Sequence, residues 1–138
     1  MNFNEFQTTG QVKKVTKDLS LAKSLIITSR QDLEFLKDLE INDVSARKIM
    51  SNYYEVLRSI LEAIVALDGY KIYSHEAFTY FLIEKKEEII ATKFDRFRKI
   101  RNKINYYGKN ISIEEVNENV TEILNIIKKL EQKYTSKV

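Results

Sequence analysis

The sequence predicts an all-α fold, a bundle of five helices that occupies residues 1–138 as a single domain. The chain contains no proline and only three glycines, so the residues that most often interrupt helices are almost absent. Apolar residues recur every three or four positions through most of the sequence, which is typical of amphipathic helices. The composition, 43% hydrophobic and 31% charged over 138 residues, is that of one globular domain.

Two helices are expected in the first half of the chain. The first extends from about Val12 to Glu40, as one long helix or as two stacked helices with a bend near Thr28–Ser29. The second begins after the capping side chains Asn42–Asp43 and ends at Asp68–Gly69, where glycine can adopt the left-handed conformation. The second helix carries the broadest apolar stripe and is expected to form the centre of the core: Met50, Tyr53, Tyr54, Leu57, Ile60, Leu61, Ile64 and Val65.

Three further helices are expected in the second half. Ser74 precedes a short third helix in the manner of an N-cap. The fourth helix runs from about Glu87 to Tyr107, and Gly108 offers its stop. The capping box Ser112–Glu115 then starts a fifth helix that continues to about Tyr134.

The composition also limits the classes of protein to which the chain can belong. It contains no cysteine, which excludes disulfide bonds and thiolate metal sites, and a chain of this size without them is expected to be cytoplasmic. No apolar run approaches the ~20 residues that span a bilayer, and the first ten residues lack the pattern of a signal peptide. No glycine-rich phosphate loop, metal-ligand spacing or Ser/His/Asp arrangement is present. We therefore expect no membrane association, no metal and no cofactor.

The positive charge of the chain is concentrated in one segment, residues 93–109. It holds seven Lys or Arg and one Asp, whereas the other sixteen basic residues are outnumbered by nineteen acidic ones, so the net charge of +3 arises here. A segregated charge of this kind favours a partner that carries phosphate groups, although a solvated helix face is the commoner cause of such runs.

A helical wheel of the fourth helix separates its basic residues into two groups. The outer arc holds Lys93, Arg96, Lys99 and Lys103. Arg101 falls inside the apolar arc, with Arg98 beside it and Asn105 one turn later, so these three should form one polar strip at the edge of the packed face. Because an unpaired buried guanidinium is costly, Arg101 must be paired or must point into a cleft. The ordinary structural explanation is an ion pair with a neighbouring helix, through Asp68 or Glu62.

Two segments resemble small stand-alone prokaryotic members of the HEPN superfamily, the higher eukaryotes and prokaryotes nucleotide-binding domains. They are RNKINYYG, residues 101–108, and YYEVLRSILEAIVALDGYKIYSHEAF, residues 53–78. The resemblance implies an up-and-down four-helix bundle with a short additional helix, and a homodimer formed through the helices that carry the motif. Many HEPN proteins are metal-independent ribonucleases, often toxins paired with a minimal nucleotidyltransferase. Others have lost the activity and act as binding or scaffold modules.

The resemblance also points to individual residues. In active members the motif is Arg, four to six residues and then His, commonly with Asn directly after the Arg. Arg101 and Asn102 match this motif, but Tyr106 stands where the family has His. A histidine, with an ordinary pKa of ~6.5, exchanges a proton at neutral pH, whereas a tyrosine, with an ordinary pKa of ~10, stays a neutral phenol. We therefore expect Tyr106 to bind a phosphate, stack on a base or anchor the helix end, and His75 to help cap the third helix.

Three hypotheses for function follow. We favour a catalytically silent module that binds a nucleotide or RNA, or that docks a nucleotidyltransferase-like partner as in a toxin–antitoxin pair. Its binding groove would contain Arg98, Arg101, Asn102, Asn105, Tyr106 and Tyr107. The second is a metal-independent ribonuclease in which Arg101, Asn102 and Tyr106 support attack by the ribose 2′-hydroxyl, with the arginine stabilising the charge that develops. The third is a purely structural helical dimer with a solvated basic face.

Overall fold

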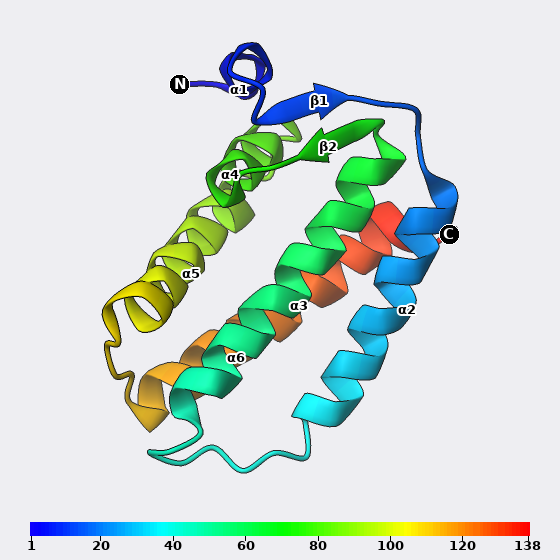
Figure 1. The fold of residues 1–138 in the computed structure, drawn as a ribbon. Helices are drawn as coiled ribbons and strands as arrows, with labels where there is room; N and C mark the ends of the chain where they lie inside the picture. Colours follow the sequence, from blue (N-terminus) through cyan, green and yellow to red (C-terminus); the bar gives the residue numbers. More distant parts are fainter.

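The computed structural model describes residues 1–138 as six α-helices and one small antiparallel sheet. Four helices are long: α2 (Leu19–Leu36), α3 (Ala46–Leu67), α5 (Glu88–Tyr107) and α6 (Ile113–Leu130). The remaining elements are α1 (Phe3–Thr8), β1 (Val12–Lys14), β2 (Tyr70–Ile72), α4 (His75–Glu84) and a π-helical turn after α6, Glu131–Thr135. Figure 1 shows α1 and the two strands at one end of the long helices. None of these helices combines the length and the apolar character that a membrane span requires.

The residues that begin and end several helices act as the sequence predicts. At the start of α6, Ser112 Oγ accepts a hydrogen bond from the backbone N–H of Glu115 at 3.1 Å, which confirms the predicted N-cap. Gly69 follows α3 and Gly108 follows α5, with φ of +83° and +62°, in the left-handed region that glycine adopts most readily. A Cβ at position 69 would also lie 3.0 Å from the Val15 carbonyl oxygen. Gly69 therefore permits a close backbone approach as well as a turn.

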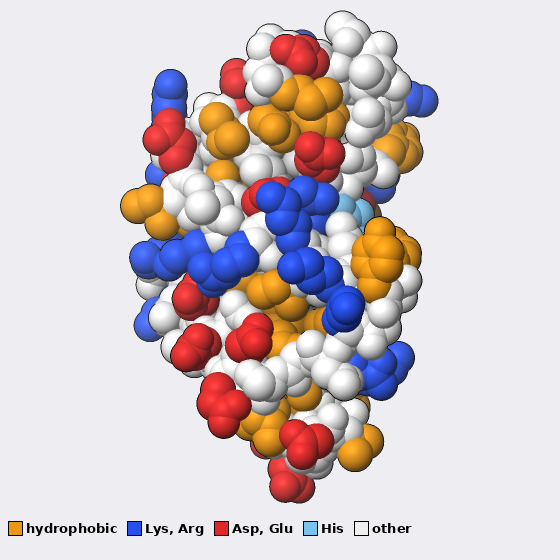
Figure 2. All heavy atoms as spheres, turned by 90° about the vertical axis from the view of Figure 1, so that its left-hand side faces the viewer, with side chains coloured by type: hydrophobic (Ala, Val, Ile, Leu, Met, Phe, Trp, Pro, Cys, Tyr) orange, Lys and Arg blue, Asp and Glu red, His pale blue; other side chains and the backbone are white.

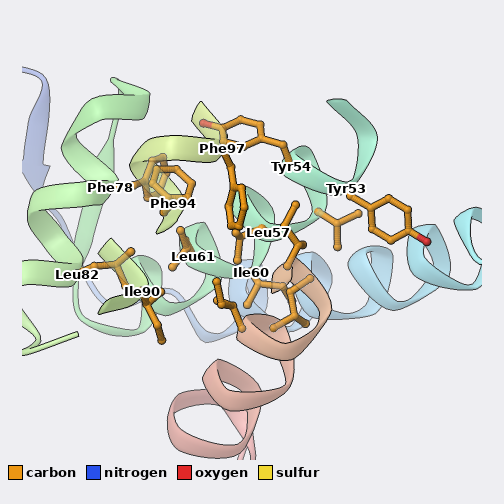
Figure 3. Packing of buried hydrophobic residues seen from close by; sticks show 14 of the residues in the cluster. Tyr53, Tyr54, Leu57, Ile60, Leu61, Phe78, Leu82, Ile90, Phe94 and Phe97 are labelled. Carbon is orange, nitrogen blue, oxygen red and sulfur yellow. The ribbon is translucent and has the colours of Figure 1, made fainter. Parts of the chain in front are cut away.

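Helix α3 forms the centre of the core, as the breadth of its apolar stripe predicts. It packs against α2, α5 and α6, and its Tyr54, Leu57 and Leu61 are completely buried. Figure 3 shows these side chains packed with aromatic rings of α4 and α5. The ring of Phe94 lies 5.5 Å from that of Tyr54 and 6.1 Å from that of Phe78, measured between centres. This packing fixes α5 against α3 and so determines which residues of α5 face α3.

The N-terminal part of the chain differs from the prediction. The segment expected to begin a helix at Val12 forms β1, and the helix begins only at Leu19 and continues as one unit to Leu36. β1 pairs with β2 so that Val12 lies opposite Ile72, and both side chains are buried. The fold is therefore mostly helical but not all-α. Apolar spacing near Val12 cannot reveal a partner so distant in the sequence.

Helix α1 is a further element that was not predicted, so the structure has six α-helices where five were expected. Asn2 Oδ1 accepts a hydrogen bond from the backbone N–H of Glu5 at 3.1 Å and caps the helix. Phe3 and Phe6 are buried, and the ring of Phe3 lies 5.7 Å from that of Phe81 on α4. With only six residues, α1 is too short to show a helical period in the sequence.

Candidate functional site

Arg101 is held by α5 between two tyrosine rings. Its guanidinium carbon lies 5.8 Å from the ring centre of Tyr54 on α3 and 5.6 Å from the ring centre of Tyr106 on α5. The side chain is 17% exposed, which confirms its predicted position at the edge of the packed face. Because aromatic faces attract a guanidinium through their negative potential, the two rings hold the group without neutralising its charge.

The polar partners of Arg101 are all distant. Nη1 donates to Oδ1 of Asn102 at 3.4 Å and to the hydroxyl of Tyr106 at 3.3 Å, and Nη2 lies 3.5 Å from Glu55 Oε1. Arg101 Nε is buried without an acceptor, and Glu55 Oε1 is buried without a hydrogen-bond donor. Charge-assisted hydrogen bonds of arginine are ordinarily about 2.7–2.9 Å long. Arg101 is therefore a largely buried guanidinium that lacks a short bond.

The predicted ion-pair partners of Arg101, Asp68 or Glu62, are wrong. Asp68 pairs with Lys85, and Glu62 pairs with other basic residues. The acidic residue nearest to Arg101 is Glu55, which lies about two turns before Glu62 on α3. Which acidic residue of α3 lies beside Arg101 depends on where α5 crosses α3. A helical wheel of α5 alone carries no information on that crossing.

Arg58 makes the strong ion pairs of this region. Its Nε donates to Glu55 Oε2 at 2.9 Å, its Nη1 donates to Glu62 Oε2 at 2.8 Å, and Lys71 of β2 donates to Glu62 Oε1 at 2.8 Å. Burial alone would raise the pKa of the Glu62 carboxyl, but the hydrogen bonds from Lys71 and Arg58 outweigh burial and hold that pKa below its ordinary value. The spacing of three and four positions on α3 is typical of helical ion pairs, so the sequence carried this signal.

His75, the first residue of α4, contacts the same tyrosine as Arg101. Its Nδ1 lies 2.8 Å from the Tyr54 hydroxyl, and the two rings stack at 23° with centres 5.8 Å apart. Burial of the ring, followed by the charges of Arg58 and Arg101, lowers the pKa of His75. Burial raises the pKa of the Tyr54 hydroxyl. The prediction that His75 helps to cap the third helix is wrong. Ser74 occupies the N-cap position, without a side-chain capping bond, and the side chain of His75 is bonded to Tyr54 instead.

A polar pocket of about 570 Å³ opens beside Arg101, between α3 and α5. It is lined by Arg47, Lys48, Ser51, Asn52, Glu55, Arg101, Ile104 and Asn105. Ser51 Oγ donates to Asn105 Oδ1 at 3.1 Å and so links the two helices. Figure 2 shows basic side chains and the chain's one histidine gathered on the face of α4 and α5. Three basic side chains, several neutral polar groups and one carboxylate, that of Glu55, therefore surround one hollow.

The predicted site residues come together only in part. The structure gathers four of them: Arg101, Asn102, Asn105 and Tyr106. Arg98 is bonded to Asp95 of its own helix at 2.8 Å, and Tyr107 is exposed and borders a different hollow. No group of three or more His, Cys, Asp or Glu side chains lies close enough to hold a metal ion.

Three members of the site were not predicted as such: Tyr54, Glu55 and His75. They come from α3 and α4, and their contacts with α5 depend on how the helices are rotated and spaced. All three nevertheless lie in residues 53–78, one of the two segments that carry the family resemblance. Their place in that segment is the one feature of the sequence that could have pointed to these three residues.

Comparison with known proteins adds no further assignment. No protein-family model, no curated protein and no solved structure matched the chain. The arrangement around Arg101 is therefore the evidence from which a function can be proposed.

Proposed function

We propose that this chain is a HEPN-type helical module that binds a nucleotide or RNA through the side chains around Arg101. One observation carries the proposal: the Arg101 guanidinium is largely buried between two tyrosine rings and has no short bond to any carboxylate. A phosphate group accepts two parallel hydrogen bonds and would supply what the guanidinium lacks. The positive charge of Arg101 therefore stays available to bind a ligand.

The surroundings of Arg101 suit an RNA strand better than a small anion. Tyr106 is 69% exposed and its ring lies beside the guanidinium, so a base can stack on its outer face. Arg47 and Lys48 border the neighbouring pocket, where Asn105 supplies a neutral amide. Phosphates, bases and ribose hydroxyls would each find a partner of suitable chemistry.

A homodimer is part of the proposal, with a nucleotidyltransferase-like protein as a further partner. Tyr106 and Tyr107 are 69% and 75% exposed at the end of α5, and adjacent exposed aromatic rings favour an interface. Light scattering on the purified protein tests the dimer. We expect twice the chain mass of 16.3 kDa, and the mass of one chain would contradict a stable dimer.

Binding of a labelled single-stranded RNA, measured by fluorescence anisotropy, tests the main proposal. We expect the wild type to bind, with an affinity that falls as salt is added, because phosphate contacts release counterions. Arg101→Ala removes a charge-assisted contact worth about 1.5–3 kcal/mol and should weaken binding at least ~10-fold. Arg96→Ala is the matched control, since it removes the same charge from the same helix at a residue that pairs with Glu122 of α6.

The control defines what would contradict the proposal. Equal losses in Arg101→Ala and Arg96→Ala would show that only net charge matters. An absence of salt-sensitive binding by the wild type would favour the structural dimer with a solvated basic face. Urea unfolding of each variant separates a loss of binding from a loss of folding.

One contact favours a ribonuclease as a second candidate. Arg101 Nη1 donates to the Tyr106 hydroxyl at 3.3 Å, which places a phenol beside the group that would stabilise transition-state charge. Cleavage of single-stranded RNA in EDTA by the wild type, lost in Arg101→Ala, would support this candidate. Cleavage gained by Tyr106→His but not by the matched Tyr107→His would indicate a site that binds RNA but lacks a base. Cleavage that persists unchanged in Arg101→Ala would exclude it.

A further inference from the structure

His75 and Arg101 approach the same aromatic ring from different helices. The ring centre of His75 and the guanidinium carbon of Arg101 each lie 5.8 Å from the centre of the Tyr54 ring. His75 begins α4, whereas Arg101 lies in the last two turns of α5. Tyr54 is completely buried and also stacks on Phe94, so its ring is fixed. The Tyr54 ring therefore contacts both an imidazole and a guanidinium.

The outer nitrogen of His75 is available to a ligand. Nδ1 is bonded to the Tyr54 hydroxyl, whereas Nε2 makes no bond within the protein and is not among the buried polar atoms that lack a partner, so it reaches solvent. The Tyr54 hydroxyl can donate to Nδ1 of a neutral imidazole or accept from Nδ1–H of a charged one. In both of these states Nε2 carries a proton and is a hydrogen-bond donor.

Charged groups from two neighbouring helices act on this imidazole. They are Glu55 and Arg58 on α3, and Arg98 and Arg101 on α5. Burial of the ring and the charges of the guanidinium groups lower the pKa of His75, which favours the neutral ring when no ligand is bound. A bound phosphate would oppose this effect, because its negative charge favours the imidazolium.

We propose that His75 and Arg101 together bind one phosphate ester, and that His75 takes up a proton when the phosphate binds. The inference rests on the proposed function, because it names a further binding residue of the same site. Arg101 donates from its outer nitrogens and His75 from Nε2, to different oxygens of one phosphate. The proton comes from the solvent and stays on the imidazole, and no bond of the phosphate is broken.

The single histidine of the chain makes the test direct, because the imidazole Hε1 resonance in a proton NMR spectrum belongs to His75 alone. Its titration midpoint is measured in the free protein, with inorganic phosphate, and with an RNA octamer that ends in either a 5′-hydroxyl or a 5′-phosphate. We expect phosphate and both RNAs to move the midpoint to higher pH. A larger change with the 5′-phosphate would identify the strand end as the bound group, and equal changes would identify an internal diester.

The affinity for RNA should depend on pH, because the bound state takes up a proton on His75. The octamer with a 5′-hydroxyl has no group of its own that titrates near neutral pH, and we expect it to bind about 10-fold more tightly at pH 5.5 than at pH 8. His75→Gln keeps a side-chain donor but cannot be charged, so its affinity for this octamer should no longer rise between pH 8 and pH 5.5. Tyr54→Phe should weaken binding at pH 5.5 about threefold or more, because the imidazole loses its anchor. Tyr53→Phe, which changes the neighbouring buried tyrosine, is the matched control.

The outcomes separate this inference from the proposed function. Arg101-dependent RNA binding with an unmoved His75 midpoint, or with the same pH dependence in His75→Gln, would overturn the inference and leave the proposed function intact. A midpoint moved by inorganic phosphate in a protein that does not bind RNA would support the phosphate site and contradict the RNA-binding part of the proposed function. A midpoint moved by neither ligand would overturn the inference.

Discussion

Two arginines approach the same carboxylate but are bonded to it very differently. Arg58 donates to Glu55 at 2.9 Å and to Glu62 at 2.8 Å, whereas the guanidinium of Arg101 comes no nearer to Glu55 than 3.5 Å. The two side chains are similarly buried, at 23% and 17% exposed. The two arginines therefore differ in the length of their bonds to carboxylates and not in their burial.

The difference assigns different roles to the two groups. A buried charge with short bonds is part of the structure, and removal of one partner leaves the other buried and unpaired. A buried charge without short bonds has already lost its water and keeps its capacity to bind. Arg58 is therefore expected to hold Glu62 in place for its bond to Lys71 of β2, and Arg101 is expected to hold a ligand.

Replacement of each arginine by methionine, which keeps the apolar stem, should separate these roles most clearly. Arg58→Met leaves Glu55 and Glu62 without their guanidinium and should lower the free energy of unfolding by about 2–4 kcal/mol. Arg101→Met loses only long contacts and should lower it by less than about 1 kcal/mol. Urea unfolding measures both changes. Equal losses would make Arg101 an ordinary structural ion pair.

Elements whose causes are local could be predicted from the sequence. Gly69, Gly108 and Ser112 act through the backbone conformation or hydrogen bonds of their own turns, so the ends of α3 and α5 and the start of α6 were located correctly. β1 could not be predicted, because Val12 belongs to a strand only through its pairing with β2. A strand of three residues leaves too short a pattern to compete with a helical one.

The candidate site divides in the same way. The position of Arg101 at the edge of the packed face follows from the helical period of α5 alone, and the structure confirms it. Its acidic neighbour does not follow, because the choice between Glu55 and Glu62 depends on how two helices pack. His75 was assigned a local capping role, whereas its bond to Tyr54 joins α4 to α3. The position of Arg101 could therefore be predicted from the sequence of its own helix, but the neighbours of Arg101 could not.

Glu55→Gln should sharpen the comparison, because both arginines approach this carboxylate. The change leaves Arg58 with Glu62 and leaves Arg101 with no anion beside it. A carboxylate beside the proposed phosphate site repels the phosphate by about 1 kcal/mol, so RNA binding should tighten about fivefold when that charge is removed. Anisotropy measures the change, and Glu118→Gln, on the exposed side of α6, is the control for net charge. Weaker binding would mean that Glu55 positions Arg101 instead of competing with its ligand.

Acid stability should depend on the Arg58 network and not on Arg101. The pKa of Glu62 is lowered in the folded protein, so the unfolded state takes up the proton first as pH falls. The stability from this group is therefore present above about pH 4.5 and is lost as pH falls through the lowered pKa. Glu62→Gln should reduce the loss of unfolding free energy between pH 5 and pH 3 by about 1 kcal/mol. Arg101→Met should leave that loss unchanged, and urea unfolding at several pH values measures both.

A smaller pH dependence is expected near neutrality. Since the pKa of His75 is lowered by folding, the unfolded state binds more protons as pH falls below the ordinary value of about 6.5. The contribution of His75 to stability is present above that pH and is lost as pH falls toward the lowered pKa. His75→Gln should remove this part of the pH dependence between pH 7 and pH 5. The effect is small because the ring is only partly buried and is screened by water.

The same imidazole also distinguishes the two arginines. After burial, the charge of Arg58 and then that of Arg101 lower the pKa of His75, so Arg58→Met and Arg101→Met should each raise the Hε1 titration midpoint of the free protein, the former by more. Only Arg101→Met should abolish the additional rise that phosphate produces, because the bonds of Arg58 are already filled by carboxylates. If Arg58→Met abolished that rise as well, in a protein shown by its NMR spectrum to be folded, both arginines would hold the ligand. Short bonds to carboxylates would then not exclude a guanidinium from binding.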